Sequence, residues 1–192
     1  MQTQIGLCRL LGAGEEQSSR LIRVMAKHMF GNFSTRSKQI VFAARFNAGE
    51  RGADMIDTDD LLAGVILEDQ APVESLLFSL VKGQGRAFNK VEPREPFFSA
   101  SAAENLLADL KKKLPRSGAV PLVEELPMSA SLHRVFDSAE AFRAQFRSNH
   151  VEPLHLLAAI LKENSGEGPR LLERWEITEL QVLSALKGAK NL

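Results

Sequence analysis

The sequence predicts an all-α protein built from two copies of one helical unit, and three observations carry this prediction. Residues 33–80 align with residues 128–175 at a constant offset of 95, without a gap. Apolar residues recur at helical spacing, and no alternating strand pattern of useful length appears. Because matched apolar positions in one register indicate a duplicated supersecondary unit, we expect a pseudo-twofold pair of four-helix repeats.

An additional helix is expected ahead of the first repeat. Residues 15–30 place apolar side chains on one stripe and two acids in the first turn, and Gly31-Asn32 ends the pattern. Residues 1–32 are therefore predicted to be an N-terminal extension with one helix.

The first repeat is predicted over residues 33–114. Ser34 is a natural N-cap, and a helix follows to about Ala48. Acidic side chains at residues 57–60 then offer cap oxygens to a second helix, and Pro72 marks the start of a third. Residues 83–98, rich in Gly, Pro and charge, are expected to be an inserted loop before a helix over 99–114.

A linker over residues 115–127, with three prolines, leads to the second repeat over 128–192. Ser129 occupies the position of Ser34 and opens a strongly amphipathic helix. Pro153 fits the first turn of the next helix, and residues 178–186 are predicted to form the closing helix.

Composition excludes several classes of function. Lys+Arg and Asp+Glu number 24 each, so the net charge is zero, which argues against a dominant role in binding nucleic acid. No apolar run approaches a membrane span, and the first residues make no convincing signal peptide. Cys8 is the single cysteine, so neither an internal disulfide nor a thiolate metal cluster is possible. We therefore expect a cytoplasmic protein.

The order of motifs resembles the Clp N-terminal domain, the repeat module at the front of the ClpA, ClpB and ClpC family of AAA+ unfoldases. Phe33-Ser34 matches the usual start of that repeat. Residues 56–66 (IDTDDLLAGVI) and 151–161 (VEPLHLLAAIL) are similar to the family's second signature, in which His155 matches a family histidine and Asp60 does not. Residues 177–180 resemble the start of its fourth helix.

The resemblance implies a binding module rather than a motor. The spacing between the repeats is longer than is usual in the family, and residues 1–32 have no family counterpart. No phosphate-binding loop of an ATPase occurs in the sequence. The chain is therefore expected not to be an enzyme, to need no cofactor or metal, and to bind Clp-type substrates, adaptors or a Clp ATPase.

Histidines and acidic residues are candidates for chemistry, but structural roles explain them. His150 and His155 are five residues apart across an expected helix start, which is not metalloprotease spacing. We expect His155 to hydrogen-bond near a helix end, and His133 to be structural or solvated. Asp57, Asp59 and Asp60 are explained by an acidic helix N-terminus.

The resemblance also supplies candidate contact residues. In some ClpC-like relatives an acidic residue of this signature helps to hold phosphorylated arginine; Asp59 occupies that position, whereas the second copy has Leu154. The Phe97-Phe98 pair anchors the core or contacts a partner. The residues predicted to contact a peptide or partner are Thr58, Asp59, Phe97, Phe98 and Glu152.

A regulatory helical protein that binds DNA or an unrelated protein is the alternative. It would use the basic side chains of Lys111–Lys113, Arg143 and Arg147. The neutral net charge counts against it, and the three lysines also suit the dipole of a helix C-terminus.

Overall fold

The computed structural model describes residues 30–70, 95–120 and 124–188, and its chain divides into two compact units, Met1–Phe33 and Ser34–Leu192. The predicted helix over 15–30, the third helix after Pro72, Cys8 and most of the insertion lie outside the described residues. Among the described residues of the second unit the helices are α2 (Thr35–Glu50), α3 (Thr58–Gln70), α5 (Ala100–Lys113), α6 (Ala130–Gln145), α7 (Pro153–Glu163), α8 (Gly168–Arg174) and α9 (Glu179–Gly188). No strand occurs among these residues, so the all-α prediction is confirmed.

The helices preserve the register of the sequence repeat. The first and last residues of α2, Thr35 and Glu50, correspond at the offset of 95 to Ala130 and Gln145, the first and last residues of α6. The first residue of α3 likewise corresponds to Pro153, the first residue of α7. The first two helices of each repeat thus start at matched positions, whereas α3 and α7 end at unmatched ones, Gln70 and Glu163.

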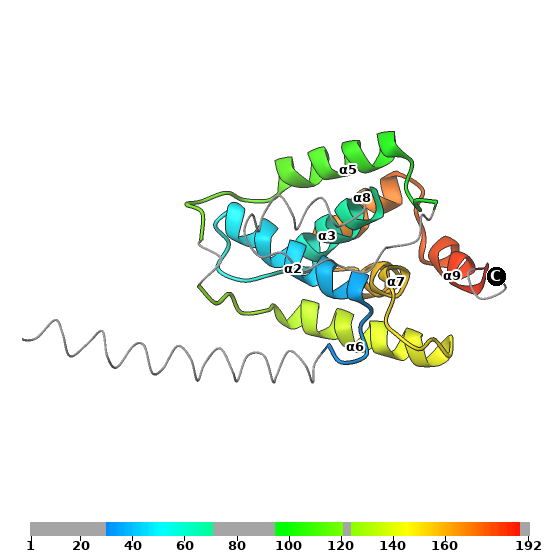
Figure 1. Ribbon diagram of the computed structural model, residues 1–192. Helices are drawn as coiled ribbons and strands as arrows, with labels where there is room; N and C mark the ends of the chain where they lie inside the picture. The colour runs from blue at the N-terminus through cyan, green and yellow to red at the C-terminus, as the bar shows by residue number, and fades with distance from the viewer. Residues whose placement is uncertain (1–29, 71–94, 121–123, 189–192) are drawn as a thin grey trace, which may run out of the picture. The chain divides into compact units, whose positions relative to one another are not determined.

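Helices α3 and α7 form the middle of the unit. Each packs against the first helix of its own repeat, α2 or α6, and against the first helix of the other repeat. Helices α5 and α9 pack against α3 and α7 respectively, and Figure 1 shows α5 and α6 on opposite sides of this central pair. The core is accordingly richest along α3 and α7, where most residues are buried.

Backbone hydrogen bonds link the two repeats through matched positions. The Ile56 amide donates to the Pro127 carbonyl at 2.8 Å, and the Ser129 amide donates to the Ile56 carbonyl at 2.9 Å. In the other direction, the Ser34 amide donates to the carbonyl of Val151, the counterpart of Ile56, at 3.1 Å. Each repeat therefore fixes the start of the other's first helix.

Hydroxyl side chains cap the helices where the sequence predicts them. The Ser34 and Ser129 hydroxyls accept from the amides of Ser37 and Leu132, three residues on, and Ser99 caps α5 in the same way. Pro153 occupies the first turn of α7, which needs no amide donor there. These serines satisfy amides that a helix start leaves without partners.

Candidate functional site

An open cleft of about 340 Å³ lies where the two repeats meet. The first repeat contributes Asp57 and Asp59 at the start of α3 and the segment that follows α5. The second repeat contributes residues 166–170, at the start of α8. Lys113 and Arg170, both exposed, are the cations at the rim of the cleft, and Arg170 pairs with Glu167, another lining residue, at 2.9 Å.

The Asp59 side chain joins the two repeats at the floor of this cleft. It is only 5% exposed, and its two carboxylate oxygens accept from the amides of Glu167, at 3.0 Å, and Gly168, at 2.7 Å. Burial raises the pKa of Asp59 above its ordinary value, although the two amides act in the opposite direction. The carboxylate thus has a structural role, and its contact with a partner stays a prediction.

Glycines allow the connection between α7 and α8 to approach Asp59 closely. Gly166 has a positive φ of 86°, a conformation that glycine adopts without strain. A Cβ atom at Gly166 would lie 2.6 Å from Asp59 Oδ1, and one at Gly168 would lie 2.6 Å from Leu62 Cδ2. Thr58, which is buried, donates its hydroxyl to the Ser165 carbonyl of the same connection at 3.2 Å.

A buried ion pair lies beside the acidic floor. The Arg51 guanidinium donates from Nε and Nη2 to the two Asp60 oxygens, both at 2.8 Å, and the Asp60 side chain is fully buried. The hydrogen bonds with Asp60 raise the pKa of Arg51. Arg51 was not identified from the sequence as the partner of Asp60. The signal that could have found it is that Arg51 aligns in the repeat with Phe146, a buried apolar residue.

The matched position in the second repeat holds His155, which makes the predicted hydrogen bond at a helix end. The ring Nδ1 accepts from the Glu152 amide at 2.9 Å, as Asp60 Oδ2 accepts from the Asp57 amide at 3.0 Å. Burial, with the nearby Arg143 charge as a second cause, lowers the pKa of His155 to about 4. The ring is therefore neutral near pH 7 and is held as a structural element.

The five predicted contact residues do not form one site. Thr58 and Asp59 lie at the cleft, whereas Phe97 and Phe98 precede the opposite end of α5 and Glu152 precedes α7. Phe98 is buried and anchors the core, and Phe97 is half-buried with its ring edge-on to that of Phe98 at 5.2 Å.

The carboxylate of Asp69, near the end of α3, accepts from the amides of both phenylalanines, at 2.9 and 2.8 Å. This contact holds the start of α5 against α3.

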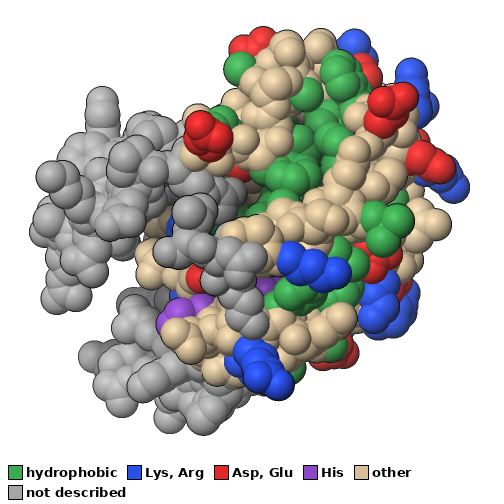
Figure 2. All heavy atoms as spheres, turned by 90° about the vertical axis from the view of Figure 1, so that its right-hand side faces the viewer, with side chains coloured by type: hydrophobic (Ala, Val, Ile, Leu, Met, Phe, Trp, Pro, Cys, Tyr) green, Lys and Arg blue, Asp and Glu red, His purple; other side chains and the backbone are tan. Residues whose placement is uncertain are grey.

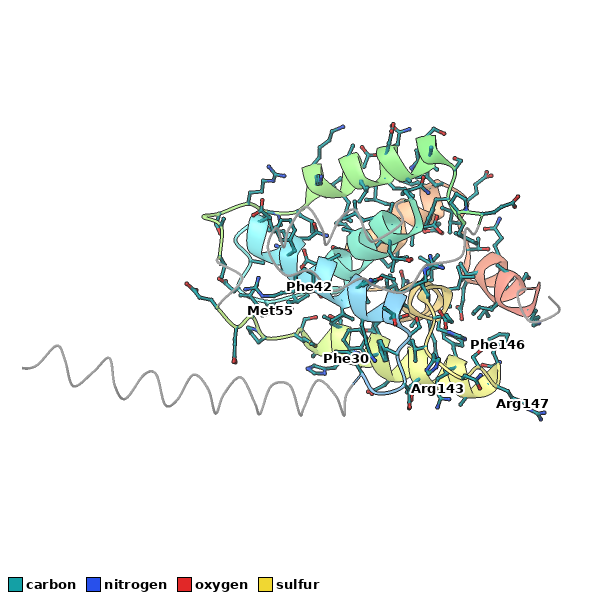
Figure 3. The ribbon with its side chains drawn as sticks, viewed as in Figure 1. Phe30, Phe42, Met55, Arg143, Phe146 and Arg147 are labelled. Atoms are coloured by element: carbon teal, nitrogen blue, oxygen red, sulfur yellow. The ribbon has the colours of Figure 1, made fainter. Side chains whose placement is uncertain are left out.

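The basic residues of the alternative function are separated in space. Lys111–Lys113 are exposed at the end of α5, and Arg143 and Arg147 lie at the end of α6, on the other side of α3 and α7 (Figure 3). Arg143 also pairs with Glu140 at 2.7 Å. The two groups do not make one basic patch.

Exposed apolar side chains occur near α9. Figure 2 shows the face on that side of the molecule, where hydrophobic side chains gather in a band. Trp175 is 39% exposed and Leu180, on the first turn of α9, is 76% exposed. Helix α9 begins at Glu179, within residues 177–180, which resemble the start of the family's fourth helix.

Within the described ranges, no group of three His, Cys, Asp or Glu side chains is placed to hold a metal ion. Of the helices in these ranges, none combines the length and the apolar character needed to cross a bilayer.

Comparisons with known proteins agree with the all-α fold. Residues 98–188, from just before α5 to the end of α9, match the model of the Clp repeat (R) N-terminal domain. The chloroplastic chaperone protein ClpD of Arabidopsis thaliana is 26% identical over 164 residues, which are 83% of this chain and 16% of the relative. The chain thus spans about a sixth of that relative's length.

Two solved structures share the fold. The crystal structure of the N-terminal domain of the Arabidopsis thaliana ClpD chaperone gives a TM-score of 0.57 at 20% identity, covering 83% of this chain and 98% of that one. A structure from investigations of a malarial protein secretion system gives a TM-score of 0.60 at 20% identity, covering 82% and 94%. The resemblance to the Clp family is therefore confirmed: this chain is related to the Clp repeat N-terminal domain family in sequence over residues 98–188 and shares its all-α fold.

Proposed function

We propose that this chain is a non-catalytic module that binds polypeptides, either unfolded substrates or adaptor proteins of a Clp-type chaperone or protease. The observation that carries the proposal is the cleft at Asp59, which residues of both repeats build together. The exposed Lys113 and Arg170 side chains at its rim offer ionic contacts to acidic side chains of a peptide and hydrogen bonds to its backbone carbonyls. The cytoplasmic location stays a prediction, since the name of the ClpD relative places that protein in the chloroplast.

Charge reversal at the rim of the cleft tests the proposal. Lys113→Glu removes an exposed cation from the rim, and Lys187→Glu, exposed on α9, is the matched control. With a permanently unfolded, acidic, fluorescently labelled polypeptide, we expect saturable binding to the unmodified chain. Lys113→Glu should weaken it about fivefold, because rim charges each contribute roughly 1 kcal/mol, and the control should not.

Affinity capture from the native cell identifies the partner class. Enrichment of a Clp ATPase, its protease or its adaptors, reduced by Lys113→Glu and not by Lys187→Glu, would support the proposal. Failure to bind any unfolded polypeptide or Clp component would overturn it. Binding of random duplex DNA with strong dependence on salt would instead favour the regulatory alternative.

A further inference from the structure

A second cavity, of about 150 Å³, lies within the first repeat between the end of α2, the start of α3 and the end of α5. Its apolar wall is formed by Ala63, Leu107, Leu110 and Leu114. A cavity of this volume with leucine walls accommodates a group of about the size of benzene. It shares Arg51 and Leu114 with the cleft at Asp59, but it is lined by Asp60 in place of Asp57 and Asp59.

The second repeat fills the matched space with aromatic rings. Asn47 and Arg51, which line the cavity, correspond to Phe142 and Phe146, which are 6% and 8% exposed. The helices carrying them, α2 and α6, have matched first and last residues, so the backbone does not differ in register. The first repeat thus carries Asn47 and Arg51 where the second carries two buried phenylalanine rings, and its Arg51 guanidinium binds Asp60. The cavity lies where these smaller or displaced side chains leave space.

The side-chain amide of Asn47, which lines this cavity, has a buried donor without an acceptor among the described residues. The Asn47 Nδ2 atom is buried, and within the described part of the chain it has no hydrogen-bond partner. A buried amide donor that lacks a partner is unfavourable, and a bound acceptor would remove that cost. The Asp60 carboxylate, which also lines the cavity, accepts from Arg51 and from the Asp57 amide and not from Asn47 Nδ2.

The mouth of the cavity favours an anion. Lys111 and Arg116 line it, are exposed, and form no ion pair with any described residue; Glu50 is the one opposing exposed charge. Because Arg51 and Asp60 neutralise one another, the lining carries a net charge of about +1.

We propose that this pocket binds an apolar group of the size of leucine or a phenyl ring that carries a carboxylate. The apolar group lies against Leu107 and Leu110, one carboxylate oxygen accepts from Asn47 Nδ2, and the charge is stabilised by Lys111 and Arg116. The chemistry is shared by two sources, the C-terminal residue of a polypeptide and a free small carboxylic acid. This pocket is separate from the cleft at Asp59 on which the polypeptide-binding proposal rests, although Arg51 and Leu114 line both.

Titration of the full chain with N-acetyl-L-leucine, followed by NMR of backbone and side-chain amides, tests this. We expect a saturable shift of the Asn47 side-chain amide, and about tenfold weaker binding of N-acetyl-L-leucinamide, since two cation contacts of roughly 0.7 kcal/mol each are lost. Asn47→Phe should fill the pocket with the side chain that the second repeat already carries and abolish binding. Lys111→Glu with Arg116→Glu, both exposed, should remove the preference for the acid over the amide.

To distinguish the two sources of the ligand, we would measure the binding of a seven-residue peptide that ends in leucine, with either a free or an amidated C-terminus. Binding of the free-ended peptide at least as tight as that of N-acetyl-L-leucine identifies a polypeptide C-terminus, whereas binding of the small acid alone identifies a free carboxylic acid. Absence of saturable binding by both probes, or binding that Asn47→Phe leaves unchanged in a folded protein, would overturn the proposal. Neither result bears on the cleft at Asp59, which has its own rim variant.

Discussion

Arg51 and Asp60 form a two-point ion pair at the positions that Phe146 and His155 occupy in the second repeat. The guanidinium and carboxylate meet through two hydrogen bonds of 2.8 Å, whereas the Phe146 and His155 rings lie with centroids 6.3 Å apart. In both repeats the residue on the central helix also accepts the amide three residues earlier. Both repeats thus keep the capping hydrogen bond at the start of the central helix. The capping residue contacts a charged partner, Arg51, in the first repeat and an aromatic partner, Phe146, in the second.

Removal of the Asp60 carboxylate should be strongly destabilising. Asp60→Ala leaves the Arg51 charge without a partner in a largely buried position, and we expect a loss of about 3–5 kcal/mol in the free energy of unfolding by urea. The double change Arg51→Phe with Asp60→His, which transplants the second-repeat pair, should recover more than half of that loss. Glu50→Ala, at an exposed residue beside Arg51, is the control and should change stability by less than about 0.5 kcal/mol. A double variant no more stable than Asp60→Ala would show that the two environments are not equivalent.

The neutral state of His155 should make stability depend on pH. The folded pKa of about 4 lies below the ordinary value of 6.5, so the unfolded chain binds a proton that the folded chain excludes. The stabilisation is fully present above pH 6.5 and is lost as pH falls toward 4, by about 3 kcal/mol in total. His155→Gln should therefore show a smaller loss than the unmodified chain between pH 7 and pH 4 in urea unfolding.

Asp59 contributes to the same profile with the opposite sign. Its folded pKa is raised above 3.8, so the folded state holds its proton more tightly and stability falls as pH rises from 3.8 through the folded pKa. Because both groups titrate in this range, the informative quantity is the difference in the free energy of unfolding between His155→Gln and the unmodified chain at each pH. His133→Gln, at an exposed residue of α6, should follow the unmodified chain, and a parallel curve for His155→Gln would contradict the assignment.

Loss of the Asp59 carboxylate should loosen the connection between α7 and α8. Asp59→Leu introduces the residue that the second repeat carries at Leu154 and leaves the amides of Glu167 and Gly168 without their acceptor. We expect a loss of about 2 kcal/mol in stability, and faster amide hydrogen exchange at residues 165–170 than elsewhere. Uniform exchange across the helices would mean that the contact does not hold this segment locally.

The approach of α2 to α3 should tolerate no side chain at Gly64. A Cβ atom there would lie 2.6 Å from the Ile40 carbonyl oxygen, so we expect Gly64→Ala to cost about 1–3 kcal/mol in thermal or urea unfolding. The matched residue Ala159 already carries a methyl group in the second repeat. Its reverse change, Ala159→Gly, should cost only about 1 kcal/mol through helix propensity. Equal costs would indicate that the two helix pairs are equally close.

Much of the fold was predictable because its signals are local. The helix starts at Ser34, Ser129 and Pro153 depend on a hydroxyl or a proline within one turn of chain, and each was confirmed. The acidic first turn of α3 was confirmed for the same reason. The division of the chain into two repeats of stated length stays a prediction.

The site was less predictable, because its contacts join residues far apart in the sequence. Asp59 meets Gly168 across 109 residues, and the Lys113 and Arg170 rim gave no motif. Phe97 and Phe98 were treated as one pair, yet one ring is buried and the other is half-exposed, which depends on how α5 packs against α3.

By itself the sequence determined the helical class, the duplicated register and the caps, since apolar periodicity and turn chemistry act over a few residues. Only the tertiary structure decided that Asp59 accepts hydrogen bonds from amides of the other repeat and that Arg51 neutralises Asp60. It also decided that Asn47 lines an open pocket, whereas its counterpart Phe142 is buried in the second repeat. The physical reason is that burial and hydrogen-bond partners are set where segments distant in sequence pack together. These two factors determine whether a charged or amide side chain is paired, neutralised or left without a partner.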